Sequence, residues 1–176
     1  TSGRVEVDGR EISDLSNTQL GLLRRDRLGF IFQSYNLIPV LTALENAEYV
    51  LMLQGIPTAE RRARVREVLA EVGLEGLENR YPRQLSGGQQ QRVAIARAIV
   101  SEPALVLADE PTANVDSKTG KALLDLMHRL NEDKGVTFFF STHEEAVMKR
   151  ARRLLQLEDG IILNVESNKD GDPSYS

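Results

Sequence analysis

Three short apolar runs, separated by stretches with helical periodicity, constrain the fold of this chain more than any other feature of its sequence. They occupy residues 28–32, 105–108 and 136–140. Uninterrupted apolar runs of this length are typical of strands that are buried on both faces, as in parallel sheets. Parallel neighbours need crossover connections, so we expect an α/β fold with a mainly parallel sheet flanked by helices.

Helical patterns fill the space between the first two runs. Residues 42–53 are expected to form one helix, and Pro57 is expected to open a second. A third helix is expected to begin near Ser86. Together these elements predict a helical subdomain over about residues 42–100.

The rest of the chain is expected to contain two more helices and two hairpins. An apolar stripe over residues 123–130 predicts a helix, and residues 144–152 suit a short one. Asp-Gly pairs at residues 8–9 and 159–160 are strong signals for tight turns between antiparallel strands.

Length and composition predict one domain with a single core. The chain has 176 residues, of which 41% are hydrophobic, and this is enough to bury a sizeable core. The domain is expected to span residues 1–165. Residues 166–176 are expected to form a polar C-terminal tail.

Composition also excludes several classes of function. The chain has no cysteine, which removes disulfides, thiol nucleophiles and Cys-ligated zinc. Its net charge is −4 and its basic residues are dispersed, so no nucleic-acid partner is expected. No apolar stretch approaches the roughly 20 residues of a membrane-spanning helix, so any membrane association is expected to go through a partner.

The most specific segment is LSGGQQQR at residues 85–92. Ser86 and Gln89 have the spacing of a capping box, which predicts the start of a helix. Gly87 and Gly88 lie in its first turn, where backbone amides without flanking side chains approach an anion closely and the helix dipole favours negative charge. The segment therefore predicts an anion-binding helix start.

Two carboxylates follow the second apolar run. Asp109 and Glu110 come directly after residues 105–108. Ligands of parallel sheets bind beyond the carboxyl ends of the strands, so both acids are expected at the ligand-binding edge. An apolar run followed by two acids often marks only a strand end, and its distance from residues 85–92 favours the functional interpretation.

The segment LSGGQQQR resembles the signature motif of the ATPases of ABC transporters, and LVLADEP at residues 105–111 is similar to their Walker B segment. The resemblance implies a P-loop NTPase fold of the ABC ATPase type, here truncated. It implies that Asp109 orients Mg²⁺ through water and that Glu110 polarises the attacking water. The residues that it implies as contacts for ATP on a second cassette are Ser86, Gly87, Gly88 and Gln89.

Three smaller motifs agree with this resemblance. Gln33 follows the first apolar run and is similar to the Q-loop glutamine, which contacts the metal and the lytic water. Asn114 and Asp116 lie in a segment that resembles the D-loop, which crosses the interface between two cassettes. His143 follows the third run and resembles the switch histidine, which contacts the γ-phosphate. Each residue alone would more often be structural, and their order along the chain supports the functional interpretation.

The resemblance extends from Thr1 to about Val165 and includes features of one subgroup. Segments within residues 32–46 and 109–114 are similar to the lipoprotein-releasing, macrolide-export and cell-division group of bacterial cassettes. It implies ATP and Mg²⁺ as cofactors of the complete family. It also implies two partners, a second cassette and a transmembrane permease subunit. The implied location is cytoplasmic, peripheral on the inner face of the cell membrane through that permease.

One family motif does not occur among these 176 residues, namely the phosphate loop, or Walker A, of Gly, four residues, and Gly-Lys-Ser/Thr. The nearest approach is Gly120-Lys121, but Val115 and Ala122 stand where a glycine and a hydroxyl residue are required. In the family this loop precedes a segment like the one at Thr1, so we expect the N-terminal part to have been cut away. Without it, the chain alone is expected to bind no cofactor and to hydrolyse no appreciable ATP.

The same loss is expected to remove an interior strand, so a non-native dimer or a rearranged sheet is expected.

Two interpretations of function remain open: an ATPase subunit that energises transport across a membrane, or a non-catalytic truncated cassette that acts as a binding or decoy module. A chromosome-maintenance or DNA-repair ATPase is a third interpretation, which the sequence disfavours. The residues between Gln33 and Asp109 contain no heptad array for the coiled coils that such proteins carry.

Overall fold

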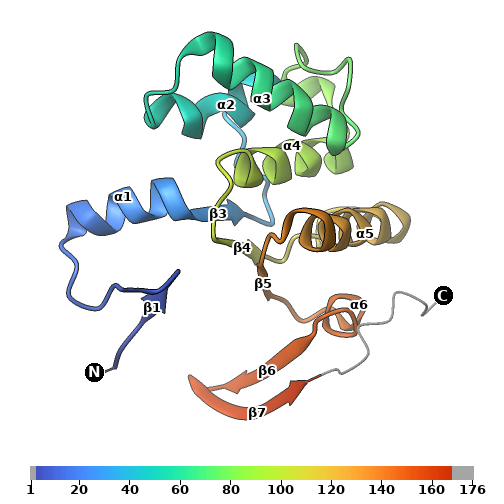
Figure 1. The fold of residues 1–176 in the computed structure, drawn as a ribbon. Helices are drawn as coiled ribbons and strands as arrows, with labels where there is room; N and C mark the ends of the chain where they lie inside the picture. The colour runs from blue at the N-terminus through green and yellow to red at the C-terminus, as the bar shows by residue number, and fades with distance from the viewer. Residues whose placement is uncertain (1–2, 168–176) are drawn as a thin grey trace.

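The computed structural model describes residues 3–167, in which helices and strands alternate along the chain (Figure 1). The elements are β1 (Glu6–Val7), β2 (Arg10–Glu11), α1 (Asn17–Arg27), β3 (Leu28–Ile31), α2 (Ala43–Leu53), α3 (Thr58–Glu71), a 3-10 turn (Pro82–Gln84), α4 (Gly87–Ile99), β4 (Leu105–Asp109), α5 (Ser117–Lys134), β5 (Phe138–Ser141), α6 (Glu145–Met148), β6 (Arg153–Glu158) and β7 (Ile161–Ser167). Both predicted hairpins are confirmed, because β1 pairs with β2 and β6 pairs with β7 in antiparallel fashion.

The central sheet has three parallel strands in the order β3-β4-β5, so β4 lies in its middle. In this register Ile31 pairs with Ala108, and Asp109 pairs with Ser141. The carboxyl ends of all three strands therefore meet at one edge of the sheet. The three apolar runs are confirmed as its strands, and the α/β fold class is confirmed with them.

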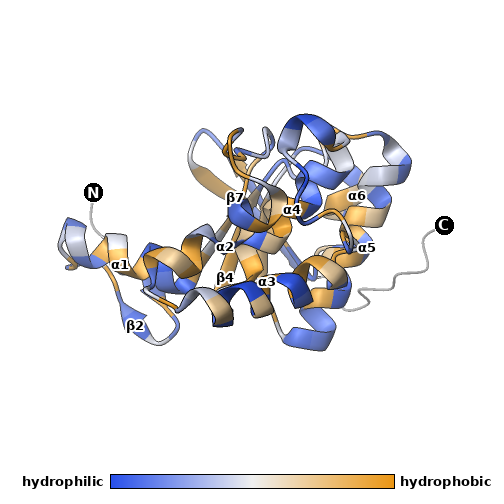
Figure 2. Cartoon of the chain, turned by 90° about the horizontal axis from the view of Figure 1, so that it is seen from above, coloured by the Kyte–Doolittle hydropathy of each residue, from blue (hydrophilic) through white to orange (hydrophobic). Residues whose placement is uncertain are grey.

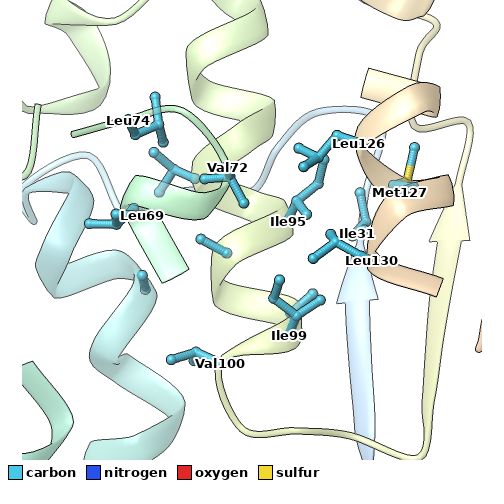
Figure 3. Close-up of a cluster of buried hydrophobic side chains, with 14 of the residues drawn as sticks. Ile31, Leu69, Val72, Leu74, Ile95, Ile99, Val100, Leu126, Met127 and Leu130 are labelled. Carbon is cyan, nitrogen blue, oxygen red and sulfur yellow. The ribbon is translucent and has the colours of Figure 1, made fainter. Parts of the chain in front are cut away.

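Helix α4 occupies the centre of the fold, between the sheet and helices α2 and α3 (Figure 1). It packs on β3 and contacts α2, α3 and α5. Figure 3 shows Ile95 and Ile99 of α4 facing Ile31 of β3 and Leu130 of α5, while Val72 lies on the other side of the helix. The core is therefore continuous across α4, and any shift of this helix would change its packing against the sheet.

Gly29 in β3 allows this close packing. A Cβ at this position would lie 2.4 Å from the carbonyl oxygen of Ala98 and 3.1 Å from Cγ2 of Val106. The first distance is shorter than real Cβ contacts and involves backbone that cannot rotate away, and the second is tighter than most real Cβ contacts. The backbone of β3 therefore contacts α4 directly.

Capping boxes fix where two of these helices begin. Thr42 and Ser86 are the N-caps of α2 and α4, and each side chain accepts a hydrogen bond from the backbone amide three residues on. Glu45 and Gln89 in turn accept hydrogen bonds from the backbone amides of the capping residues. The predicted helix start at Ser86 is confirmed.

One observed helix was not predicted. Helix α1 (Asn17–Arg27) buries only Leu23 and is otherwise strongly polar, so it lacks the apolar stripe on which the analysis relied. Its start carries the same capping box as α4, formed by Ser16 and Gln19. The local cap was therefore the signal that the sequence analysis overlooked.

Two predicted elements are shorter in the structure. Strand β5 begins only at Phe138, because Gly135 ends α5 with a φ of 67° and the carbonyl of Val136 accepts a hydrogen bond from Asn131. The helix predicted over residues 144–152 contains only Glu145–Met148. Of the predicted tail, residues 166 and 167 belong to β7, and the remainder lies outside the described residues.

The structure leaves an open sheet edge and an exposed hairpin. Within residues 3–167, β5 pairs with β4 alone, and Phe139 on this strand is 50% exposed. Figure 2 shows hydrophobic colour on β7, which is exposed over its whole length. The exposed apolar residues of the hairpin are Leu155, Leu157, Ile161, Ile162, Leu163 and Val165. This agrees with the expected open edge, and the pairing of that edge with another chain stays a prediction.

Candidate functional site

The site is built around the carboxyl end of β4. Asp109 is the last residue of the strand and is exposed, and Glu110 follows it with a φ of 44°. This left-handed conformation is uncommon for a residue with a side chain and costs about 1 kcal/mol or more, so the surrounding structure must hold it. The amide of Glu110 donates a 2.9 Å hydrogen bond to the carbonyl of Ser141 at the end of β5. The turn therefore directs Glu110 toward the residues after β5.

Glu110 and His143 form the tightest pair at this edge. Oε1 of Glu110 lies 2.5 Å from Nδ1 of His143 and accepts a 3.2 Å hydrogen bond from the His143 amide. Oε2 accepts a 3.0 Å hydrogen bond from the hydroxyl of Thr142. Burial raises the pKa of Glu110, but the bonds from His143 and Thr142 outweigh it, so the pKa lies below its ordinary value. Glu110 is therefore an ionised carboxylate whose oxygens are oriented, as a water-polarising group requires.

Asp109 and Gln33 lie at the ends of neighbouring strands, and both are exposed. Within the described residues no group of three His, Cys, Asp or Glu side chains could hold a metal ion. One carboxylate and one amide oxygen are still the ligands that suit Mg²⁺, which keeps most of its waters and takes phosphate oxygens. The residues present therefore fit a magnesium ion that arrives with a nucleotide, and they do not form a protein cage for a free ion.

The helix start at Ser86 lies beside this edge. Both signature glycines are closely packed, because a Cβ at Gly87 would lie 2.8 Å from the hydroxyl of Tyr35 and one at Gly88 would lie 2.4 Å from Cγ2 of Thr119, so these side chains would have to shift. The Gln89 side chain is engaged in the capping box with Ser86. Ser86 thus has a capping role in this structure, in addition to its predicted place in an anion site.

The segment after β4 connects the helix start with the Q-loop. Asn114 donates a 2.9 Å hydrogen bond from its side chain to the carbonyl of Gln33. Asp116 is the N-cap of α5 and accepts a 3.0 Å hydrogen bond from the amide of Thr119. The bonds to Thr119 lower the pKa of Asp116. Asp116 therefore shapes the helix that packs against Gly88.

The structure places Gln33, Asp109, Glu110 and His143 at or just after the carboxyl ends of the three strands, and the helix start at Gly87 and Gly88 packs against Asn114 and Thr119. A further contact ties the two halves together, because Nε2 of Gln91 on α4 donates a 2.6 Å hydrogen bond to the carbonyl of Pro111, next to Glu110. The helix start and the acidic strand end are thus neighbours, which the functional interpretation required. Sequence analysis gave no role to four residues that organise this edge, although Gln91 lies within residues 85–92 and Tyr35 within residues 32–46: Tyr35, Gln91, Arg97 and Thr142.

No helix within residues 3–167 is long and apolar enough to cross a membrane.

Comparison with known proteins places this geometry in context. The family model described as ABC transporter matches residues 1–113. The ABC transporter ATP-binding protein YtrE of Bacillus subtilis is 44% identical over 162 residues, which are 92% of this chain and 70% of that protein. The macrolide export ATP-binding/permease protein MacB of Syntrophobacter fumaroxidans is 45% identical over 98% of this chain and 24% of that protein.

A solved structure shows the same fold. The dimeric structure of a post-hydrolysis state of the ATP-binding cassette MJ0796 of Methanocaldococcus jannaschii, bound to ADP and Pi, superposes with a TM-score of 0.83 at 44% identity. The match covers 95% of this chain and 74% of that cassette. With a family model over more than half of its residues, and relatives this similar over most of their length, the chain belongs to the ABC transporter family of ATP-binding cassettes.

Proposed function

We propose that this chain is part of the ATP-hydrolysing subunit of a transporter, which energises transport across a membrane with a permease partner. The observation that carries the proposal is the joined edge, where Ser86, Glu110 and Gln33 come from three elements to one side of the sheet. The association with a permease is supported by relatives that are named ATP-binding/permease proteins. We place the chain at the cytoplasmic side of that membrane, held there by the permease.

The residues divide into two sets with different roles. Glu110 polarises the attacking water, and His143 orients its carboxylate and contacts the terminal phosphate. Asp109 and Gln33 hold Mg²⁺ through water, and the ion supplies neutralisation of phosphate charge when it is bound. The second set serves a nucleotide held by a second cassette, and it consists of Ser86, Gly87, Gly88, Gln89, Asn114 and Asp116.

The carboxyl end of β4, with Asp109 and Glu110, is called the acid edge below. Residues 1–176 contain this acid edge and the signature but no phosphate loop. In phosphoryl transfer most of the rate comes from positioning and charge neutralisation, so Glu110 has no substrate held in line without that loop. We therefore infer that the 176-residue chain binds no appreciable Mg-ATP, and that its signature acts on ATP carried by a complete cassette.

The first test is calorimetric titration of the 176-residue chain with Mg-ATP. We expect no heat of binding, and micromolar affinity would contradict the inference. The second is ATP-dependent association with a complete cassette of the family in which the glutamate corresponding to Glu110 is replaced, so that ATP is retained.

A matched pair of variants makes the second test specific. Ser86→Asp keeps a good N-cap but places a negative charge where the phosphates of the partner must approach. Ser16→Asp is its control, because Ser16 forms the same capping box at α1. We expect Ser86→Asp to abolish association and Ser16→Asp to leave it unchanged. Equal behaviour of the two variants would remove the role of the signature.

A further inference from the structure

The Q-loop contains a strained turn that α4 holds in place. Tyr35 and Asn36 have φ values of 60° and 48°, in the left-handed region that residues with side chains rarely adopt. Arg97 of α4 donates hydrogen bonds to the carbonyls of both residues, at 2.8 Å to Tyr35 and 2.6 Å to Asn36. A planar guanidinium with several donors suits such paired acceptors. The turn is therefore fixed to the helix that carries the signature.

The side chain of Tyr35 extends from this turn to the D-loop. Its hydroxyl donates a 3.0 Å hydrogen bond to the carbonyl of Asn114. The side-chain amide of Asn114 donates a 2.9 Å hydrogen bond back to the carbonyl of Gln33. The two bonds close a ring between segments that lie far apart in sequence, so neither segment moves without breaking a bond or carrying the other with it.

The same hydroxyl lies against the first signature glycine. A Cβ at Gly87 would be 2.8 Å from the Tyr35 hydroxyl, 3.8 Å from Cζ of its ring and 3.5 Å from the Asn114 carbonyl. Only the first distance is a clash, so the space beside Gly87 is filled by the hydroxyl and not by the ring. Tyr35, which lies in the Q-loop, thus contacts both the D-loop and the signature at one point.

We propose that Tyr35 is a positioning residue that latches the D-loop and Gly87 to the Q-loop. Movement of Gln33 is transmitted through the latch to the two segments that face a second cassette. The inference rests on the proposed function for its consequence, but the latch itself is a property of this chain. A tyrosine that only filled space would be replaced by phenylalanine without effect, because its ring would remain.

The test uses the 176-residue chain with Tyr35→Phe, Gly87→Ala and the double variant. Tyr49→Phe is the control, since Tyr49 is 38% exposed on α2 and its hydroxyl makes no hydrogen bond within the described residues. Amide hydrogen exchange is measured over residues 33–36 and 113–116. Loss of one hydrogen bond is expected to speed exchange in both segments about fivefold in Tyr35→Phe. Tyr49→Phe is expected to leave it unchanged.

The double variant separates a latch from general packing. Gly87→Ala is expected to speed exchange over residues 113–116, because the new methyl displaces the hydroxyl. In the Tyr35→Phe background the same methyl meets the ring carbon and the Asn114 carbonyl, both at ordinary distances, so it is expected to add nothing. Additive effects, or exchange in Tyr35→Phe equal to that in Tyr49→Phe, would overturn the proposal.

ATP-dependent association with the complete cassette supplies an independent readout. Tyr35→Phe is expected to weaken it about fivefold while the fold is unchanged by circular dichroism. If the unsubstituted chain does not associate at all, the proposed function fails, and the exchange measurements still decide the latch.

Discussion

Replacement of Gln91 by glutamate tests whether α4 holds the acid edge through one buried hydrogen bond. Gln91 is 0% exposed, and its Nε2 donates to the carbonyl of Pro111 at 2.6 Å. Its Oε1 has no hydrogen-bond partner within the described residues. In Gln91→Glu the new carboxyl can keep the bond only as an O–H donor, because two oxygens without a proton would repel each other.

The cost of that proton sets the magnitude. An ordinary glutamate has a pKa of about 4.3, so keeping the carboxyl neutral at pH 7 costs about 3.7 kcal/mol, and at pH 5 only about 1 kcal/mol. The sign follows from linkage: the folded pKa is raised, so the unfolded state loses its proton first and the penalty grows as the pH rises above 4.3. The slope is about 1.4 kcal/mol per pH unit.

Urea unfolding at pH 5, 6 and 7 measures this slope. Gln90→Glu is the matched control, because the neighbouring Gln90 is partly exposed and its carboxyl can ionise in water. Gln91→Met removes the hydrogen bond and leaves the buried carbonyl of Pro111 without its donor, but it introduces no titratable group, so its cost is expected to be about 1–3 kcal/mol and the same at every pH. A Gln91→Glu variant that loses the same free energy at pH 5 and pH 7 would refute the reasoning.

Two further predictions concern the packing of β3 and the Glu110 pair. Gly29→Ala forces a methyl against the Ala98 carbonyl and is expected to lower the free energy of unfolding by about 1–3 kcal/mol, whereas Gly21→Ala, in open space on α1, is expected to raise it by up to about 1 kcal/mol. Urea denaturation of the two variants measures both changes in the free energy of unfolding. Equal changes would mean that β3 can move away from α4 without loss of stability. The lowered pKa of Glu110 means that its contribution to stability is complete above the ordinary value of 4.5 and is lost as the pH falls through the folded pKa. The difference in unfolding free energy between the unsubstituted chain and Glu110→Gln should therefore shrink below pH 4.5, and a difference that does not vary with pH would show that the pair has no such role.

The fold was largely predictable because its signals are local. Apolar runs marked the three strands, and the Ser86 and Gln89 pair marked the start of α4. Helix α1 was missed because it buries a single leucine, so hydrophobic periodicity had almost nothing to report. Its capping box was present in the sequence, which shows that caps carry information where apolar stripes do not.

The site was predictable only in part, for a physical reason. Asp109 and Glu110 were singled out because they end an apolar run, and His143 because its place after the third run resembles the family's switch histidine. The register of the parallel sheet then brings these positions to one edge. The residues that hold this edge together act on backbone groups that are distant in sequence. Arg97 binds carbonyls 61 and 62 positions away, and Tyr35 binds one 79 positions away. No local pattern encodes such contacts.

In the contacts that hold this edge the acceptors are backbone carbonyls, whereas the donors are side chains. Every residue has a carbonyl, so a substitution at Asn36 or Pro111 keeps the acceptor as long as the backbone keeps its path. The donors at Gln91 and Arg97 are side chains on α4, and their loss leaves those carbonyls without a partner. The backbone after β4 and in the turn at Tyr35 and Asn36 therefore depends on the face of α4 that binds it, and the helix that begins with the signature also holds the residue next to Glu110.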